Sequence, residues 1–150
     1  MTTAHKGVGM DRCLIVANKT LMSEELLKAV LARRDERPCQ FHLVVPATHP
    51  WGAWSQGSVR AMTKERLAEG IAYFAEHGVT CDGDIGDHNP VRAVTDLLAH
   101  DSDFDEIIVS TLPVGPSAWI HEDVPARLRR MVHVPVTHVI TAPQRHAAAV

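Results

Sequence analysis

Five short apolar runs alternate with longer segments in which apolar residues recur every three or four positions. The runs cover residues 13–17, 41–45, 79–85, 106–110 and 135–140. The runs at 13–17 and 106–110 are the most apolar and are typical of strands buried on both faces of a sheet. Asp82 and Asp84 interrupt the third run, so this strand is predicted to lie at an edge with one face in solvent.

The segments between the runs carry helix signals. Ser23 is suited to capping a helix that runs to about residue 35, and a second helix is predicted over 59–77, with Gly78 ending it. Asn89 and Asp123 are placed to cap the last two helices, each with a proline in its first turn. Residues 47–58, with Trp51 and Trp54, are predicted to form a long loop.

Strands that alternate with helices predict an α/β protein with a doubly wound, Rossmann-like parallel sheet and helices on both faces. The 150 residues fit a single domain, with a core over about 12–141 and termini that carry no pattern. The strands at 13–17 and 106–110 are expected to be central. A ligand site is expected beyond their carboxyl ends, where the strand order reverses.

Composition and net charge limit which kinds of partner the protein is expected to bind. Hydrophobic residues make up 45% of the chain and the net charge is -3, which disfavours nucleic acid as a partner. No run is long enough to cross a membrane, and the first residues lack a secretion signal, so a cytoplasmic protein is expected. The short arginine clusters at 33–34 and 127–130 are interpreted as helix-end cations.

Cysteine and histidine spacing gives no sign of a metal centre. The three cysteines have no CxxC spacing, so neither a disulfide framework nor a zinc site is expected, and buried reduced thiols are the simpler interpretation. The ten histidines show no HExxH or paired ligand spacing. His42 and His138 fall within strands and are expected to be satisfied core or interface residues.

The expected site has a polar rim at the ends of the two central strands. Asn18, Lys19 and Thr20 follow one strand, and Ser110 and Thr111 end the other. The alternative is that these residues only cap turns and helices. The chain has no GxGxxG, Walker or GxSxG motif, and no catalytic set can be assembled from spacing. His88 and His121 are the histidines placed where an acid or base would be of use.

Five segments, CLIVAN, FHLVVP, GDHNPVRAV, DEIIVST and VPVTHVI, resemble the universal stress protein family in their order and spacing. The resemblance covers about residues 12–141. It implies the strand order 3-2-1-4-5, a homodimer and, in one subgroup, binding of an adenine nucleotide.

The chain departs from the ATP-binding members of that family. Asn18 stands where they have an aspartate after the first strand. Their motif G-x-x-G-x(9)-G-[ST] places Ser110, Pro113 and Asp123 at the three glycine positions and Val124 at the hydroxyl position. Proline has no N–H to offer a phosphate, and Asp123 repels one at the start of a helix. The resemblance therefore implies a degenerate triphosphate site.

Three functions remain open. The first is a non-catalytic stress-response or regulatory domain that acts as a homodimer with an unnamed protein partner, without cofactor or metal. The second is a binding protein for ATP, AMP or adenosine, and the third is an enzyme that uses His121 or His88. The expected ligand residues are Ala17, Asn18, Lys19, Val45, Pro46, Asp84, Ser110, Thr111, Gly115 and Ser117. The last strand, an apolar edge, is expected to form the dimer through Pro135, Val136, His138 and Val139.

Overall fold

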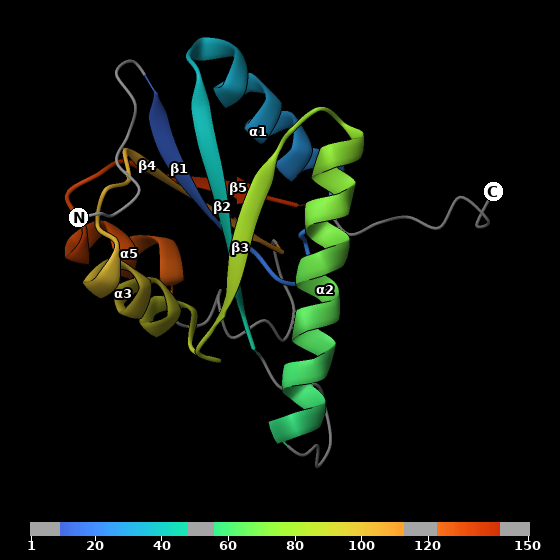
Figure 1. Cartoon of the computed structure of the whole chain (residues 1–150). Coiled ribbons are helices and arrows are strands. Elements are labelled where there is room, and N and C mark those ends of the chain that lie inside the picture. The colour runs from blue at the N-terminus through green and yellow to red at the C-terminus, as the bar shows by residue number, and fades with distance from the viewer. Residues whose placement is uncertain (1–9, 48–55, 113–122, 142–150) are drawn as a thin grey trace.

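A computed structural model describes residues 10–47, 56–112 and 123–141 of the chain. Five parallel strands form one sheet in the order β3-β2-β1-β4-β5 (Figure 1). The strands are β1 (Asp11–Val16), β2 (Cys39–Pro46), β3 (Cys81–Gly86), β4 (Glu106–Thr111) and β5 (Val136–Ile140). The predicted order, the central places of β1 and β4, and the edge position of β3 are confirmed.

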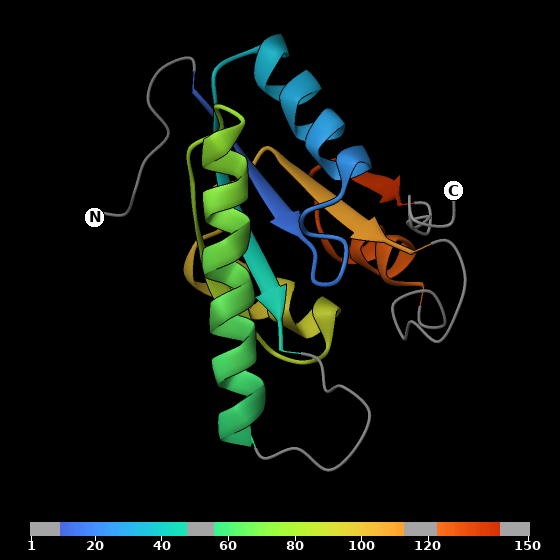
Figure 2. The same ribbon diagram turned by 90° about the vertical axis from the view of Figure 1, so that its right-hand side faces the viewer.

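Helices cover both faces of the sheet. The described residues form α1 (Glu24–Glu36), α2 (Gln56–Glu76), α3 (Pro90–His100) and α5 (Val124–Met131). Figure 2, turned from the view of Figure 1, shows α1 and α2 on one face, with α3 and α5 behind the sheet on the other. The predicted doubly wound arrangement is therefore confirmed. No helix in the described part of the chain is long and apolar enough to cross a membrane.

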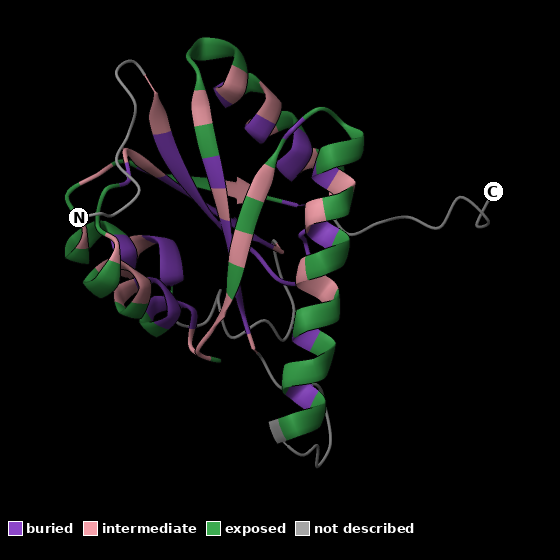
Figure 3. Cartoon of the chain, viewed as in Figure 1, coloured by how far each residue is buried: buried purple, intermediate pink, exposed green. Residues whose placement is uncertain are grey.

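Alternate residues of β1 divide the core into two layers. Cys13 and Ile15 pack in the layer under α1 and α2, whereas Leu14 and Val16 pack under α3 and α5. All four side chains are fully buried, as the continuous apolar run predicts for a central strand. Figure 3 shows the buried positions gathered on the inner strands and the exposed ones along β3.

Two of the three predicted helix caps are confirmed. Ser23 accepts a hydrogen bond from the Leu26 amide at 3.2 Å, and Asn89 accepts one from the Val91 amide at 3.0 Å. Asp123 precedes α5, but its side chain makes no capping bond, so that prediction is wrong. The reason is its backbone: φ is 52°, in the left-handed region, whereas a capping side chain needs extended backbone to reach the next amides.

Two predicted bounds are corrected. Helix α2 begins at Gln56, ahead of the predicted start at 59, so residues 56–58 belong to the helix and not to the predicted loop. Strand β3 begins at Cys81 instead of 79, because the Val79 amide still bonds to the Phe74 carbonyl of α2 at 2.8 Å. Gly78, with a φ of 82°, makes this turn. Trp51 and Trp54 lie outside the described residues.

The cysteine prediction holds for one residue of three. Cys13 is fully buried, but Cys39 and Cys81 are half-buried, at the starts of β2 and β3. The sequence interpretation treated all three as buried because their spacing indicates neither a disulfide framework nor a zinc site. The structure instead places the last two at the open amino ends of the strands.

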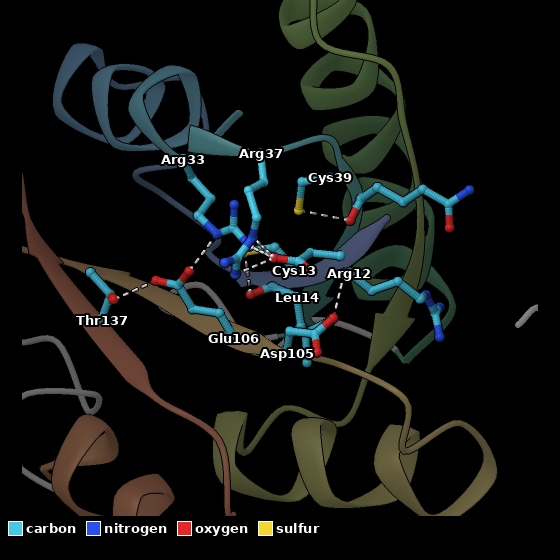
Figure 4. A network of polar contacts seen from close by, with 11 residues as sticks. Arg12, Cys13, Leu14, Arg33, Arg37, Cys39, Asp105, Glu106 and Thr137 are labelled. Carbon is cyan, nitrogen blue, oxygen red and sulfur yellow. Dashed lines mark hydrogen bonds and ion pairs between the residues drawn. The ribbon is translucent and has the colours of Figure 1, made fainter. Parts of the chain in front are cut away.

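Ion pairs fasten α1 to the amino edge of the sheet (Figure 4). The Arg33 side chain is only 7% exposed, donates to Glu106 at 2.8 Å and pairs with Asp11. Arg37 donates to the same Asp11 carboxylate at 2.7 Å. Arg33 thus has a structural role, as predicted for the arginine cluster at the end of this helix. Its ion pairs also extend beyond the helix to β1 and β4.

Candidate functional site

Asn18 closes the carboxyl end of β1 with both ends of its side-chain amide. Its Nδ2 donates to the Pro46 carbonyl at the end of β2, at 2.6 Å, and its Oδ1 accepts a hydrogen bond from Arg66 of α2. Asn18 is only 7% exposed. The predicted site residue is therefore an anchor between two strands and a helix, and the polar group nearer to solvent is the half-buried Arg66.

Buried hydroxyl groups join the carboxyl ends of β1, β4 and β5 on the α1 side. Thr20 Oγ1 lies 2.6 Å from Ser110 Oγ, which lies 3.3 Å from Thr141 Oγ1. Thr141 continues to the Ser23 hydroxyl at 3.1 Å. Residues that follow different strands are thus brought together as predicted. The hydroxyls of Thr20 and Ser110 bond to each other, which differs from the capping of turns and helices that the structural alternative expected.

Thr111 turns to the other face of the sheet. Its hydroxyl lies 2.7 Å from Nε2 of His138 on β5, and the threonine is 3% exposed. Partial burial, with the nearby Arg129 cation adding to it, lowers the pKa of His138. A neutral imidazole that accepts from the hydroxyl fits these surroundings. The expectation of a hydrogen-bonded histidine is met, but His138 is an exposed residue of β5 and not a core residue.

The other predicted ligand residues have different places. Ala17 and Val45 are fully buried in the core, and Lys19 is exposed at the rim. Asp84 is on the face that carries α3, where His42 bonds to it at 3.0 Å and to Asp82 at 2.7 Å. Asp84 is therefore not brought together with the hydroxyl groups. The remaining predicted or discussed positions outside the described residues are Pro113, Gly115, Ser117, Trp119 and His121.

A cavity of about 420 Å³ opens at the carboxyl ends of β2 and β3, beside the start of α2. It is lined by Ala47, Val59, Arg60, Ile85, Gly86, Asp87, His88 and Asp96. The sequence interpretation included His88 but missed Arg60 and Arg66. Their helical segment was recognised, but no motif in it indicates which arginine turns toward the sheet.

The described residues offer no catalytic set. The buried hydroxyls of Ser110 and Thr111 are engaged with other side chains. The His88 side chain is 66% exposed and lies 3.5 Å from Asp87. Among residues 10–47, 56–112 and 123–141, no three His, Cys, Asp or Glu side chains are placed to hold a metal ion.

The sequence matches no protein-family model and no curated protein. Solved structures do match. A universal stress protein from Archaeoglobus fulgidus in complex with dAMP has a TM-score of 0.61 at 16% identity, over 87% of this chain and 97% of that one. Another structure of universal stress protein from Archaeoglobus fulgidus has a TM-score of 0.60 at 15% identity, over 86% and 93%.

A third similar structure comes from a plant. A universal stress protein family protein from Arabidopsis thaliana with AMP bound has a TM-score of 0.56 at 15% identity, over 93% of this chain and 94% of that one. The likeness extends across nearly the whole of each neighbour, and the strand order is the one that the resemblance implied. This chain therefore has the fold of the universal stress proteins.

Proposed function

We propose that this domain is a non-catalytic regulatory protein of the universal stress protein type, which binds a nucleoside monophosphate at the carboxyl edge of its sheet and acts as a cytoplasmic homodimer. The position of Arg66 is the observation that supports the proposed ligand. Its guanidinium is half-buried beside Asn18, between α2 and the end of β1. No carboxylate pairs with it within the part of the chain that the structure describes.

A guanidinium that pairs with none of the described carboxylates suits a ligand with one phosphate at this edge. A guanidinium has five N–H donors in a planar fork, so its bond to Asn18 leaves donors for a phosphate oxygen. The neighbouring structures with dAMP and with AMP contain nucleoside monophosphates. Their fold is that of this chain, which supports the same class of ligand here.

The start of α5 argues against a longer phosphate chain. Asp123 precedes the helix, and because its carboxylate makes no capping bond, its charge is not used by the helix amides. An anion at this position repels the β- and γ-phosphates of ATP. Pro113, at another glycine position of the family motif, adds no N–H donor. We therefore expect AMP to bind more tightly than ATP.

Calorimetry with AMP, adenosine and ATP tests the ligand. Arg66→Gln should weaken AMP binding by about ten- to a hundredfold, the effect of one charge-assisted hydrogen bond of about 1.5 to 3 kcal/mol, and should leave adenosine binding nearly unchanged. Arg60→Gln is the matched control, because this arginine is on the same helix but lines the neighbouring cavity. ATP binding tighter than AMP binding would overturn the proposal.

Chromatography of the nucleotide after long incubation with the protein tests the absence of catalysis. AMP and ATP should be recovered unchanged. The proposal of a non-catalytic domain rests on the hydroxyl groups of Thr20, Ser110 and Thr141, which bond to one another and not to a base that would activate a nucleophile. Steady production of a hydrolysed nucleotide that is lost in His88→Gln would favour the enzyme instead.

Strand β5 supports the dimer. It is the outer strand beside β4, and Ile140 on it is 54% exposed. An exposed edge strand with apolar side chains is a surface that a second copy covers by extending the sheet. Val136 was expected in this interface but is only 8% exposed and belongs to the core. The interface is therefore assigned to the exposed side chains of β5.

A further inference from the structure

The cavity of about 420 Å³ at the carboxyl ends of β2 and β3 is separate from the contact between Arg66 and Asn18. Neither of these two residues is among the described residues that line it. Arg60 lines it from the first turns of α2 and Asp96 from α3, and Figure 1 shows these helices on opposite sides of the carboxyl end of β3. Its volume is within the range of about 300 to 1,000 Å³ that is typical of sites for small molecules.

The floor of this cavity is apolar and is held by the sheet itself. The Ala47 amide donates to the Gly86 carbonyl at 3.0 Å, which joins the ends of β2 and β3. Val59 of α2, which is only 4% exposed, and Ile85 of β3 add aliphatic side chains. Because hydrogen bonding and packing within the protein fix these groups, the floor offers apolar contact to a ligand without rearrangement.

Gly86 lets α3 come close enough to complete the rim of the cavity. A Cβ built at Gly86 would lie 2.5 Å from the Cβ of Ala93, so this approach of the helix to the strand end requires a glycine. Asp96 is one helical turn beyond Ala93, and residues at this spacing are neighbours on one face of a helix. The close packing at Gly86 therefore brings Asp96 to the cavity that it lines.

The charged groups of the cavity do not neutralise one another. Within the described part of the chain, Arg60 forms no ion pair and the Asp96 carboxylate accepts no hydrogen bond. Asp87 accepts from the Asn89 amide at 2.9 Å through Oδ2, and His88 Nδ1 lies 3.5 Å from the same oxygen. The described residues therefore place a cation on the α2 side and carboxylates on the α3 side of one cavity.

A ligand that carries both charges suits this arrangement. Arg60 would repel a polyamine, and Asp87 and Asp96 would repel a dicarboxylate. We propose that the cavity binds an α-amino acid with a small apolar side chain, in addition to the nucleotide proposed above. Its carboxylate bonds to the Arg60 guanidinium and its ammonium group to Asp96 and Asp87. Its side chain contacts Val59 and Ile85.

Both charges of the ligand are required, because Arg60 and Asp96 are exposed and a single exposed ion pair contributes little to binding. Titration of the isotope-labelled full chain with L-valine, followed by NMR, should shift the amide signals of Ala47 and Gly86. Isovalerate, which lacks the ammonium group, and isobutylamine, which lacks the carboxylate, should each bind at least about tenfold more weakly than valine. An analogue that binds as tightly as valine, or no shift at tens of millimolar valine, would overturn the proposal.

Two variants assign the two charges of the ligand to their partners. Arg60→Gln should weaken valine binding at least about tenfold and leave the weaker binding of isobutylamine unchanged. Asp96→Asn should weaken valine binding and leave isovalerate binding unchanged. Lys64→Gln is the matched control, because it removes an exposed cation one turn along α2 that does not line the cavity. Valine binding that persists in Arg60→Gln, or that is lost in Lys64→Gln, would contradict the proposal.

AMP distinguishes this cavity from the proposed nucleotide site. Valine binding should be the same with and without excess AMP, because the two ligands use different arginines. A protein that binds valine but not AMP would refute the nucleotide proposal and support this one. Competition between AMP and valine for the same amide signals would show that the cavity is no separate site and would refute the inference.

Discussion

Arg66 of α2 and Asn18 at the end of β1 bond to each other through their side chains, and the same Asn18 donates to the Pro46 carbonyl at 2.6 Å. The family resemblance suggests Asn18→Asp as a route back to ATP binding. The structure predicts a cost instead, because a carboxylate has no hydrogen to donate and would face the carbonyl oxygen.

Asn18→Asp should lower the free energy of unfolding at pH 7 by about 1 to 3 kcal/mol, the cost of leaving buried polar groups unpaired. Urea denaturation measures it. Arg66→Gln is the comparison, since it removes the partly exposed partner and keeps the bond to Pro46. It should cost less. Equal stability of Asn18→Asp and the unchanged protein would show that the bond to Pro46 contributes nothing to the free energy of unfolding.

Acid should weaken the fold through the pair between Arg12 and Asp101. Arg12 donates to both carboxylate oxygens, at 2.7 and 2.8 Å, and lies over the Phe104 ring at 4.2 Å. Its hydrogen bonds lower the pKa of Asp101. A carboxyl whose folded pKa is lowered stabilises the fold above its unfolded pKa of about 3.9, and this contribution is lost as the pH falls through the folded pKa.

Arg12→Met keeps the stem that packs on Phe104 but removes the charge. It should destabilise the protein at pH 7 and also flatten the loss of stability below about pH 4, as measured by urea unfolding at several pH values. Arg92→Met, at an exposed position of α3, should leave the acid slope unchanged. An unaltered slope in Arg12→Met would mean that other carboxylates account for acid unfolding.

Gly70 allows α2 to approach the loop after β1. A Cβ built at this glycine would lie 2.4 Å from Cδ2 of Leu21, a side chain that is 1% exposed. Gly70→Ala should therefore destabilise the protein by about 1 to 3 kcal/mol through overpacking, despite the roughly 1 kcal/mol that alanine gains in a helix.

Thermal unfolding of the double-mutant cycle with Leu21→Ala tests the contact. Leu21→Ala alone should be costly, but adding Gly70→Ala to it should then be neutral or stabilising, because the clash is gone. Additive losses would place the effect of Gly70→Ala elsewhere than at Leu21.

The dimer prediction concerns Ile140 on the outer edge of β5. Ile140→Lys should give monomers in analytical ultracentrifugation, because a charge on the strand edge opposes pairing with a second copy. Met131→Lys is the matched control, since Met131 is 53% exposed but lies on α5. A monomer before any substitution, or a dimer that survives Ile140→Lys, would rule out this interface.

The sequence was sufficient for the sheet but only partly so for the site. The apolar runs within β1 and β4 and the alternating aspartates of β3 indicate burial directly, so the central and edge places of these strands could be predicted, whereas the full strand order was implied by the family resemblance. Asn18 and Ser110 were placed correctly at the carboxyl edge of the sheet, but the residues to which they bond were not predicted. Arg66 and Thr141 are far from both in sequence, and only tertiary packing brings them there.

The chain of hydroxyls from Thr20 to Ser23 has a mechanical consequence. Thr141 follows β5, bonds to Ser110 and to the cap of α1, and its amide bonds to the Thr111 carbonyl at 2.8 Å. A force applied to the chain after residue 141 would meet these contacts before it reaches the ladder between β4 and β5. Stretching the molecule by its two ends should therefore first break the hydrogen bonds of Thr141, while the central strands are still paired.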